Sequence, residues 1–299
     1  GRVLCPAPFL ATASQFVPAV RLAGTADQRR RFLGAVAAGE VVGALAVSEG
    51  DGKVDRGAVT TTATPAAGGA WRLEGEKRYV LEAGRADEVV VAARLPGTSG
   101  ADGIGLFVVP GERLEVVPLH SVDATRPVGG FRLEGFEVEA GRALGEPGDS
   151  GPALSAALEE ATVALAAEMV GTSQAIFDVV HAYVLEREQF GVKIGSFQAI
   201  KHKLANMYVA LESARATTYF AAAALDEDDD RRAVAVSMAK SAAGDCQKLM
   251  AQEGIQCLGG IGYTWEHDMH LYVKRQKAQA ALLGTAAEHR ARIAAAIGL

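Results

Sequence analysis

Residues 187–202 have the sequence REQFGVKIGSFQAIKH and separate two long stretches of helical periodicity. Arg187 stands at the end of the first stretch, where the negative end of a helix dipole stabilises a cation. The same guanidinium could instead grip a diphosphate through two parallel hydrogen bonds. Phe190 could be an ordinary core residue, or a surface against which a flat ring lies. The residues alone leave both pairs of interpretations open.

A second break, with the sequence QCLGGIGY, spans residues 256–263 and again lies between helical patterns. Its glycines allow the backbone to approach another group closely and to adopt left-handed conformations. It is not a dinucleotide-binding fingerprint, because it follows a helix rather than a strand and lacks the third glycine. A helix C-cap with close helix packing is the simpler interpretation of Gly259 and Gly260.

The helical patterns around these breaks predict a helical bundle over residues 149–299. Between residues 154 and 184, apolar side chains recur at spacings of four and seven, which gives one helical stripe. Further helices are expected over residues 196–225, over 231–258, from about 266, and after Gly284 to about 297. Long helices joined by short turns form up-and-down bundles.

Upstream, residues 41–148 show short apolar or alternating segments, which predict a small β domain. Strands are expected at 41–47, 70–80 (two strands with a turn at Gly75), 88–93, 104–109, 114–117 and 131–138. Residues 1–40 suggest short helices, one of them starting near Asp27 behind a Thr25 N-cap. The fold class is therefore α+β: a small β-barrel or sandwich domain between an N-terminal helical segment and a C-terminal up-and-down helical bundle.

The composition opposes several classes of function. The formal net charge of −6 gives no support for binding to nucleic acid or to an anionic membrane. We find no apolar run of the ~18 residues that a membrane-spanning helix needs, and no signal-peptide pattern. The three cysteines lack metal-site spacing, and His267 and His270 fit the polar start of a helix better than a metal site. A cytoplasmic protein without a metal is expected.

The two breaks, in this order and in a chain of helices, strands and helices, resemble the acyl-CoA dehydrogenase family of flavoproteins. The resemblance covers nearly the whole chain and is strongest over residues 187–191, 197–198, 202–207 and 256–263. It implies FAD as cofactor, an acyl-CoA as substrate and an electron-acceptor flavoprotein as partner. It also implies a homo- or hetero-oligomer, a dimer or tetramer, with the flavin at the subunit interface, and makes residues 1–40 the remainder of an N-terminal helical domain.

The resemblance also implies roles for individual residues. Arg187, Gln189 and Phe190 correspond to family residues that contact the flavin of a neighbouring subunit. Gln256, Gly259 and Gly260 correspond to the turn that packs on the diphosphate and adenosine part of FAD. Ser48 and Tyr79 correspond to residues of the β domain near the isoalloxazine ring, and Thr285 to a threonine near the cofactor.

One departure concerns the catalytic base. In the family a glutamate commonly precedes Gly-Thr in the last helical segment, but here Leu283 precedes Gly284 and Thr285. Leucine cannot take the α-proton of an acyl thioester, although its backbone N–H could still bind the thioester oxygen. Some family members place the base near the start of the first long bundle helix. That position corresponds to Ala161 here, and a shift of one residue makes Glu160 a candidate base, with a solvated helix surface as its ordinary alternative. Glu168, a carboxylate on an otherwise apolar stretch, is a second candidate, with a buried ion pair as its ordinary alternative.

Three functions follow from the resemblance. The first is α,β-desaturation of an acyl-CoA thioester, by proton abstraction and hydride transfer to flavin N5, with a displaced base. The second is a base-lacking, FAD-contacting subunit of a heteromeric acyl-CoA dehydrogenase, a type found in bacterial breakdown of sterol side chains and other bulky acyl groups. The third is a flavin monooxygenase on the same fold.

Overall fold

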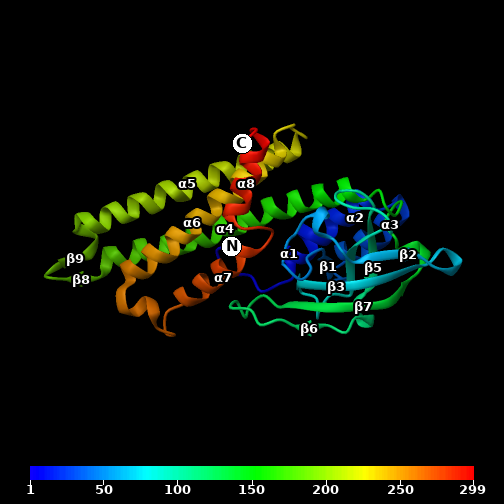
Figure 1. The fold of residues 1–299 in the computed structure, drawn as a ribbon. Helices are drawn as coiled ribbons and strands as arrows, with labels where there is room; N and C mark the ends of the chain where they lie inside the picture. The colour runs from blue at the N-terminus through cyan, green and yellow to red at the C-terminus, as the bar shows by residue number, and fades with distance from the viewer. The chain divides into compact units, whose positions relative to one another are not determined.

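The computed structural model describes residues 1–299, and the chain separates into two compact units. Residues Ala7–Ala161 form the β unit, and Gly1–Pro6 with Thr162–Leu299 form the helical unit. Figure 1 shows strands and short helices in the first and long helices in the second, which confirms the predicted fold class. The predicted domain boundaries at residues 40 and 148 stay a prediction.

The β unit contains one curled seven-stranded sheet with the order β1-β4-β2-β3-β7-β6, in which β5 pairs with β4. Pairing is parallel for β1–β4 and β2–β4 and antiparallel elsewhere. The strands are β1 (Gly43–Ala46), β2 (Thr62–Pro65), β3 (Trp71–Leu81), β4 (Glu88–Arg94), β5 (Ile104–Pro110), β6 (Val117–Pro118) and β7 (Val128–Val138).

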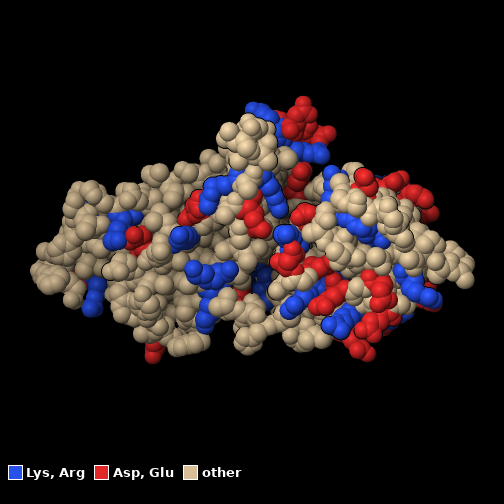
Figure 2. All heavy atoms as spheres, viewed as in Figure 1, with Lys and Arg blue, Asp and Glu red and all other residues tan.

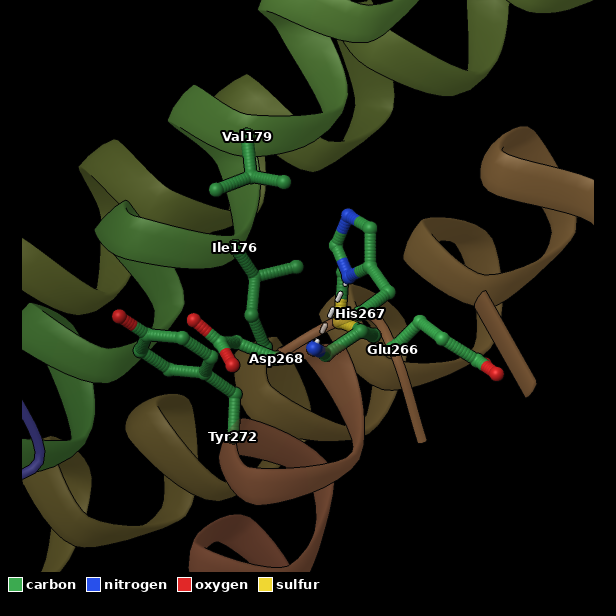
Figure 3. A pocket seen from close by; sticks show the side chains of 7 residues that line it. Ile176, Val179, Glu266, His267, Asp268 and Tyr272 are labelled. Carbon is green, nitrogen blue, oxygen red and sulfur yellow. Dashed lines mark hydrogen bonds between the residues drawn. The ribbon is translucent and has the colours of Figure 1, made fainter. Parts of the chain in front are cut away.

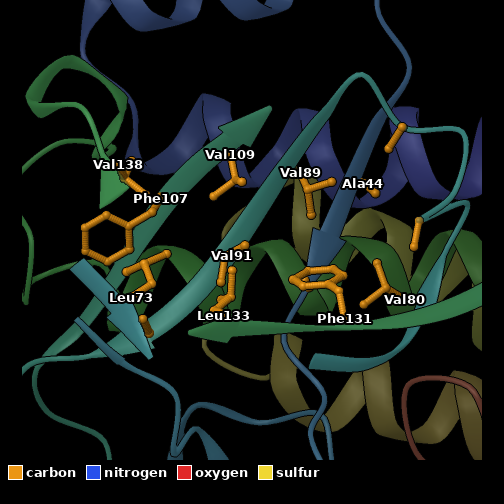
Figure 4. Close-up of a cluster of buried hydrophobic side chains, with 14 of the residues drawn as sticks. Ala44, Leu73, Val80, Val89, Val91, Phe107, Val109, Phe131, Leu133 and Val138 are labelled. Atoms are coloured by element: carbon orange, nitrogen blue, oxygen red, sulfur yellow. The ribbon is translucent and has the colours of Figure 1, made fainter. Parts of the chain in front are cut away.

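The apolar sequence of β4 follows from its burial on both faces. Successive side chains of a strand point to opposite faces, so Val89 and Val91 enter one core while Val90 enters another. The first core fills the inside of the curled sheet, where Phe107 and Phe131 lie among aliphatic side chains (Figure 4). A strand buried on both faces has no polar alternation, which explains the unbroken apolar run.

Short helices supply the second core of the β unit. They are α1 (Phe9–Ala11), a π-helical turn (Thr12–Phe16), α2 (Val17–Ala23) and α3 (Ala26–Ala37). Phe16 and Phe32 from these helices pack with Leu154 from the start of α4 (Gly151–Glu186). Thr25 caps α3 through a capping box with Gln28, as predicted.

Three predictions for the β unit were wrong in detail. Gly75 lies inside the continuous strand β3, at a register shift against β7, and is not a turn. It has a φ of +149°, and a Cβ there would lie 2.6 Å from Thr61 Oγ1, so only glycine fits without displacement. The predicted strand at 114–117 reduces to Val117–Pro118, and β2 was missed because residues 62–65 are small and polar.

Long helices form the helical unit, as predicted for a bundle. After α4 they are α5 (Gln198–Asp226), α6 (Arg232–Leu258), α7 (Met269–Ala281) and α8 (Ala286–Ala296). Their shared core includes Ile176 and Val180 from α4, Met207 from α5 and Met250 from α6. Charged side chains of both signs are interspersed over the face shown in Figure 2.

The α4 helix is long and apolar enough to cross a membrane by length and composition alone. However, 56% of its most apolar window is buried inside the protein, as in the core helix of a soluble bundle. One such helix is weak support for a membrane span.

Candidate functional site

The first sequence break folds as a β-hairpin at the end of α4. Its strands are β8 (Glu188–Gln189) and β9 (Val192–Lys193), and the turn residues Phe190 and Gly191 have φ values of +56° and +78°. Two positive φ angles are the signature of the tight turns that match strand twist. The hairpin therefore projects Phe190 at its tip, instead of folding it into the bundle.

The side chains of Arg187, Gln189 and Phe190 are exposed on the surface. Phe190 is 93% exposed, which excludes the interpretation as a core residue, and its only aromatic neighbour is Phe197, in an edge-to-face arrangement at 6.2 Å. The Arg187 guanidinium is exposed and has no hydrogen bond or ion pair within the chain. The Gln189 side chain is also exposed, and its only hydrogen bond is to the neighbouring Glu188 carbonyl. A cation and an aromatic ring are thus presented together to the exterior.

The second break ends α6. Gly259 has a φ of +66° and donates its N–H to Ile255 O, as a helix C-cap, and residues 259–263 continue as a 3-10 turn. A Cβ on Gly259 or Gly260 would meet no heavy atom within 4 Å. The glycines therefore leave open space over this turn, and the exposed Gln256 side chain lies one helical turn before it. No hydrogen bond or ring contact joins this turn to the hairpin side chains.

In the β unit, Ser48 and Tyr79 lie close to each other. Arg78 N–H donates to Ser48 O at 2.9 Å, next to Tyr79, whose φ is +58° and whose side chain is 45% exposed. The Ser48 hydroxyl is buried and has no hydrogen-bond partner. Buried polar atoms are nearly always paired, with protein or with ordered water, so this hydroxyl is available to a water molecule or a ligand.

A fully hydrogen-bonded ion pair between Glu49 and Lys77 holds the loop that carries Ser48. Glu49 accepts from Lys77 Nζ at 2.7 Å and from the backbone N–H and hydroxyl groups of Thr60 and Thr61. Burial alone would raise the pKa of Glu49, but the Lys77 charge and these hydrogen bonds lower it to about 2. Burial lowers the pKa of Lys77 to about 8, although the Glu49 charge opposes this. Glu49 is thus a structural anion and has no capacity left for proton transfer.

The turn after α7 carries Leu283 and Thr285. Leu283 is 5% exposed and has a φ of +57°, which is uncommon for a residue with a branched side chain. Thr285 caps α8 in a capping box with Glu288, so its hydroxyl already serves the helix. Its proposed proximity to a cofactor stays a prediction.

Both candidate bases lie in ion pairs. Glu160 accepts from Arg21 Nη2 at 2.5 Å, and both side chains are partly exposed. Glu168 accepts from Arg275 Nη1 at 2.6 Å, and that arginine side chain is 0% exposed. The ordinary alternative for Glu168, a buried ion pair, is therefore present in the structure. A carboxylate in either position must leave or share its guanidinium to act as a base.

A small pocket of about 300 Å³ lies near the start of α7 (Figure 3). Its lining combines Ile176 and Val179 from α4 with Glu266, His267 and Asp268 from the preceding loop. His267 Nδ1 accepts from Met269 N–H at 3.0 Å and thus helps to start the helix. No group of three or more His, Cys, Asp or Glu side chains is arranged as metal ligands.

Two residues near Leu283 escaped the sequence analysis. Lys240 of α6 and His289 of α8 are buried, and both contact the backbone of the turn at residues 283–284. A signal for Lys240 existed, because it continues the buried spacing of Val236, Ala243 and Gln247 along α6. A lysine in such a stripe needs a specific partner.

The chain matches two family descriptions. "Acyl-CoA dehydrogenase, middle domain" matches residues 44–138, and "Acyl-CoA dehydrogenase, C-terminal domain" matches residues 151–298. A glutaryl-CoA dehydrogenase of Desulfococcus multivorans is 32% identical over 252 residues, which cover 82% of this chain and 64% of that protein. The acyl-CoA dehydrogenase IpdE2 of Mycobacterium tuberculosis is 36% identical over 231 residues, 77% of this chain and 63% of that protein.

The fold is similar to solved structures over almost all of its length. The butyryl-CoA dehydrogenase of Megasphaera elsdenii superposes with a TM-score of 0.91 at 26% sequence identity, covering 97% of this chain and 76% of that one. A glutaryl-CoA dehydrogenase in complex with glutaryl-CoA gives a TM-score of 0.87 at 27% identity, covering 98% of this chain and 74% of that one. The chain spans slightly less than two thirds of the length of the two curated relatives above.

Proposed function

Since the chain belongs to the acyl-CoA dehydrogenase family, whose members are FAD-dependent oxidoreductases acting on CH–CH bonds, we propose that it takes part in FAD-dependent α,β-desaturation of an acyl-CoA thioester. The observation that carries this proposal is the hairpin. It presents Arg187, which makes no hydrogen bond or ion pair within the chain, and a 93% exposed Phe190, whose ring contacts that of Phe197 only. An exposed guanidinium and an exposed aromatic ring on one hairpin suit a diphosphate joined to flat rings.

The residues of the chain fit such a cofactor at three places. Arg187, Gln189 and Phe190 would hold the FAD of a neighbouring subunit. The open backbone at Gly259 and Gly260, with Gln256, would accept its diphosphate and adenosine part. Ser48, whose buried hydroxyl lacks a partner, would donate to or accept from the ring system beside Tyr79. An oligomer in which each flavin lies at a subunit interface follows from this division of contacts.

The reaction needs a hydride acceptor, a base and a group that polarises the thioester. FAD, when bound, supplies the acceptor for the β-hydrogen. The backbone N–H of Leu283 would bind the thioester oxygen, which makes the α-proton more acidic. Electrons would then pass to an electron-acceptor flavoprotein.

The catalytic base is the one group of this reaction that the chain does not clearly provide. Leu283 has no acidic group, and Glu160 and Glu168 each hold a guanidinium. We propose these two carboxylates as the candidate bases of an autonomous enzyme. The same observation favours a second candidate function, a subunit of a heteromeric acyl-CoA dehydrogenase whose partner provides the base. Loss of the glutamate would also permit a flavin monooxygenase, which no further observation favours.

Anaerobic mixing with octanoyl-CoA separates these functions. An autonomous enzyme reconstituted with FAD loses its visible flavin absorbance when the thioester is added, and Glu160→Gln or Glu168→Gln abolishes the loss. A heteromeric subunit shows bleaching only when it is co-purified with a homologous subunit. Product formation that requires oxygen and reduced flavin would instead identify a monooxygenase. Absence of FAD binding in both preparations would contradict the proposal.

A further inference from the structure

Two buried side chains converge on the turn between α7 and α8. Lys240 Nζ donates to Gly284 O at 2.8 Å and to Gln279 O at 3.3 Å, with Ala280 O at 3.5 Å. His289 Nε2 lies 3.0 Å from Leu283 O. Both side chains are almost fully buried, so these contacts are not shared with bulk water. Successive carbonyls of the turn are therefore bound by two different helices.

The hydrogen-bond chemistry fixes the state of His289. A carbonyl oxygen only accepts, so Nε2 must carry the proton. Nδ1 then accepts from the Ser237 hydroxyl on α6, at 3.3 Å. Burial lowers the pKa of His289 to about 4, so the ring is neutral near neutral pH. A neutral Nε2–H tautomer is the form that this geometry requires.

The clamp formed by Lys240, His289 and Ser237 explains the backbone of Leu283. A φ of +57° is unfavourable for a leucine and persists only where the surroundings impose it. A Cβ on the next residue, Gly284, would lie 3.1 Å from His289 Nε2, so the ring packs directly on the turn. The turn is thus held on its carbonyl side.

On the amide side of the same turn, Gly284 N–H donates to Ala281 O at 3.3 Å and Thr285 N–H to Glu288 Oε2 at 2.7 Å, which leaves the Leu283 N–H unused. The N–H of Leu283 has no hydrogen-bond partner within the chain, although the residue is 5% exposed. Buried amides without partners are rare. The carbonyl groups of the turn are fixed, and the strained Leu283 has a free N–H. This N–H is therefore held in position to donate to a ligand.

We propose that Lys240 and His289 are positioning residues that hold the Leu283 N–H in place for the carbonyl oxygen of an acyl thioester. The identity of that ligand rests on the proposed function, whereas the clamp itself does not. Lys240 and His289 act through the backbone of the turn and touch no reacting atom. The role holds equally for an autonomous enzyme and for a subunit of a heteromer.

Amide hydrogen exchange of the full chain without ligand tests the clamp. Lys240→Met and His289→Leu should raise the amide exchange rate of residues 282–285 by about tenfold or more. Without the clamp, the turn can open by itself while the rest of the fold stays closed. His289→Gln should restore protection, since its amide can replace the Nε2–H donor. Lys248→Met is the matched control, an exposed lysine on the same helix. Unchanged exchange in both Lys240→Met and His289→Leu would overturn the clamp.

A pair of ligands tests the positioning role. Octanoyl-CoA carries the thioester carbonyl, and the thioether octyl-CoA lacks it. Lys240→Met and His289→Leu should weaken octanoyl-CoA about tenfold while leaving octyl-CoA unchanged, as loss of one hydrogen bond predicts. Equal weakening of both ligands would overturn the role, because it indicates general damage to the pocket. If wild type binds neither ligand, the proposed function fails and the exchange data alone decide the clamp.

Discussion

At the scale of single residues, two glutamates on one helix have different surroundings. Glu168 pairs with an arginine that is 0% exposed, whereas the Glu160 and Arg21 side chains are 33% and 48% exposed. Breaking a buried pair leaves an uncompensated charge, and exposed pairs contribute little. The sequence offered both as equivalent candidates, because burial of the partner arginine depends on contacts that only the fold creates.

Glu168→Gln should therefore lower the free energy of unfolding by about 3 kcal/mol, and Glu160→Gln by less than about 1 kcal/mol. Chemical denaturation of the two variants measures both values. Equal destabilisation would mean that the Glu168–Arg275 pair is better solvated than its burial indicates.

His289 makes a pH-dependent contribution to stability. Its pKa is lowered to about 4, chiefly by burial, from an ordinary value of 6.5. Between these values the unfolded chain binds a proton that the folded chain does not, so stability falls as the pH is lowered through that interval. Between about pH 7 and about pH 4.5, wild type should lose about 2 kcal/mol more than His289→Gln does. Identical pH profiles would show that His289 is not buried as a neutral ring.

At the scale of elements, the breaks between helices were predictable but their forms were not. Glycine and the end of the apolar stripe located the first break within a few residues. The two-residue strands β8 and β9 are too short for any alternation to indicate them. The turn predicted at Gly75 is wrong for a related reason, since glycine marks turns but also marks close approach of another segment within a strand, here Thr61.

Two glycine-to-alanine changes compare a position that requires glycine with one that does not. Gly75→Ala should destabilise the protein by about 2 kcal/mol, because the added methyl meets Thr61 and the φ of +149° disfavours alanine. Gly34→Ala, in the interior of α3 with no atom within 4 Å of the new methyl, should stabilise it by about 0.5 kcal/mol. Thermal unfolding of both variants tests the pair, and a neutral Gly75→Ala would contradict the close approach of Thr61 to Gly75.

At the scale of the whole molecule, the order of structural elements and the family followed from the sequence. Periodicity distinguished strands from helices, and the residues at the two breaks carried the resemblance. The clamp on Leu283 could not be predicted, because Lys240, Ser237 and His289 meet the turn only through tertiary packing of α6 and α8. The cytoplasmic location and the residue roles toward FAD stay predictions.

The central claim is that this chain holds FAD through the hairpin at the end of α4. The most direct measurement is a calorimetric titration of FAD into the full chain, alone and co-purified with a homologous subunit, for wild type and Arg187→Met. We predict that Arg187→Met weakens FAD binding by about tenfold or more, with an unchanged melting temperature because the arginine has no partner within the chain. Equal FAD affinity of the two proteins, or no binding by wild type in either preparation, would contradict the account.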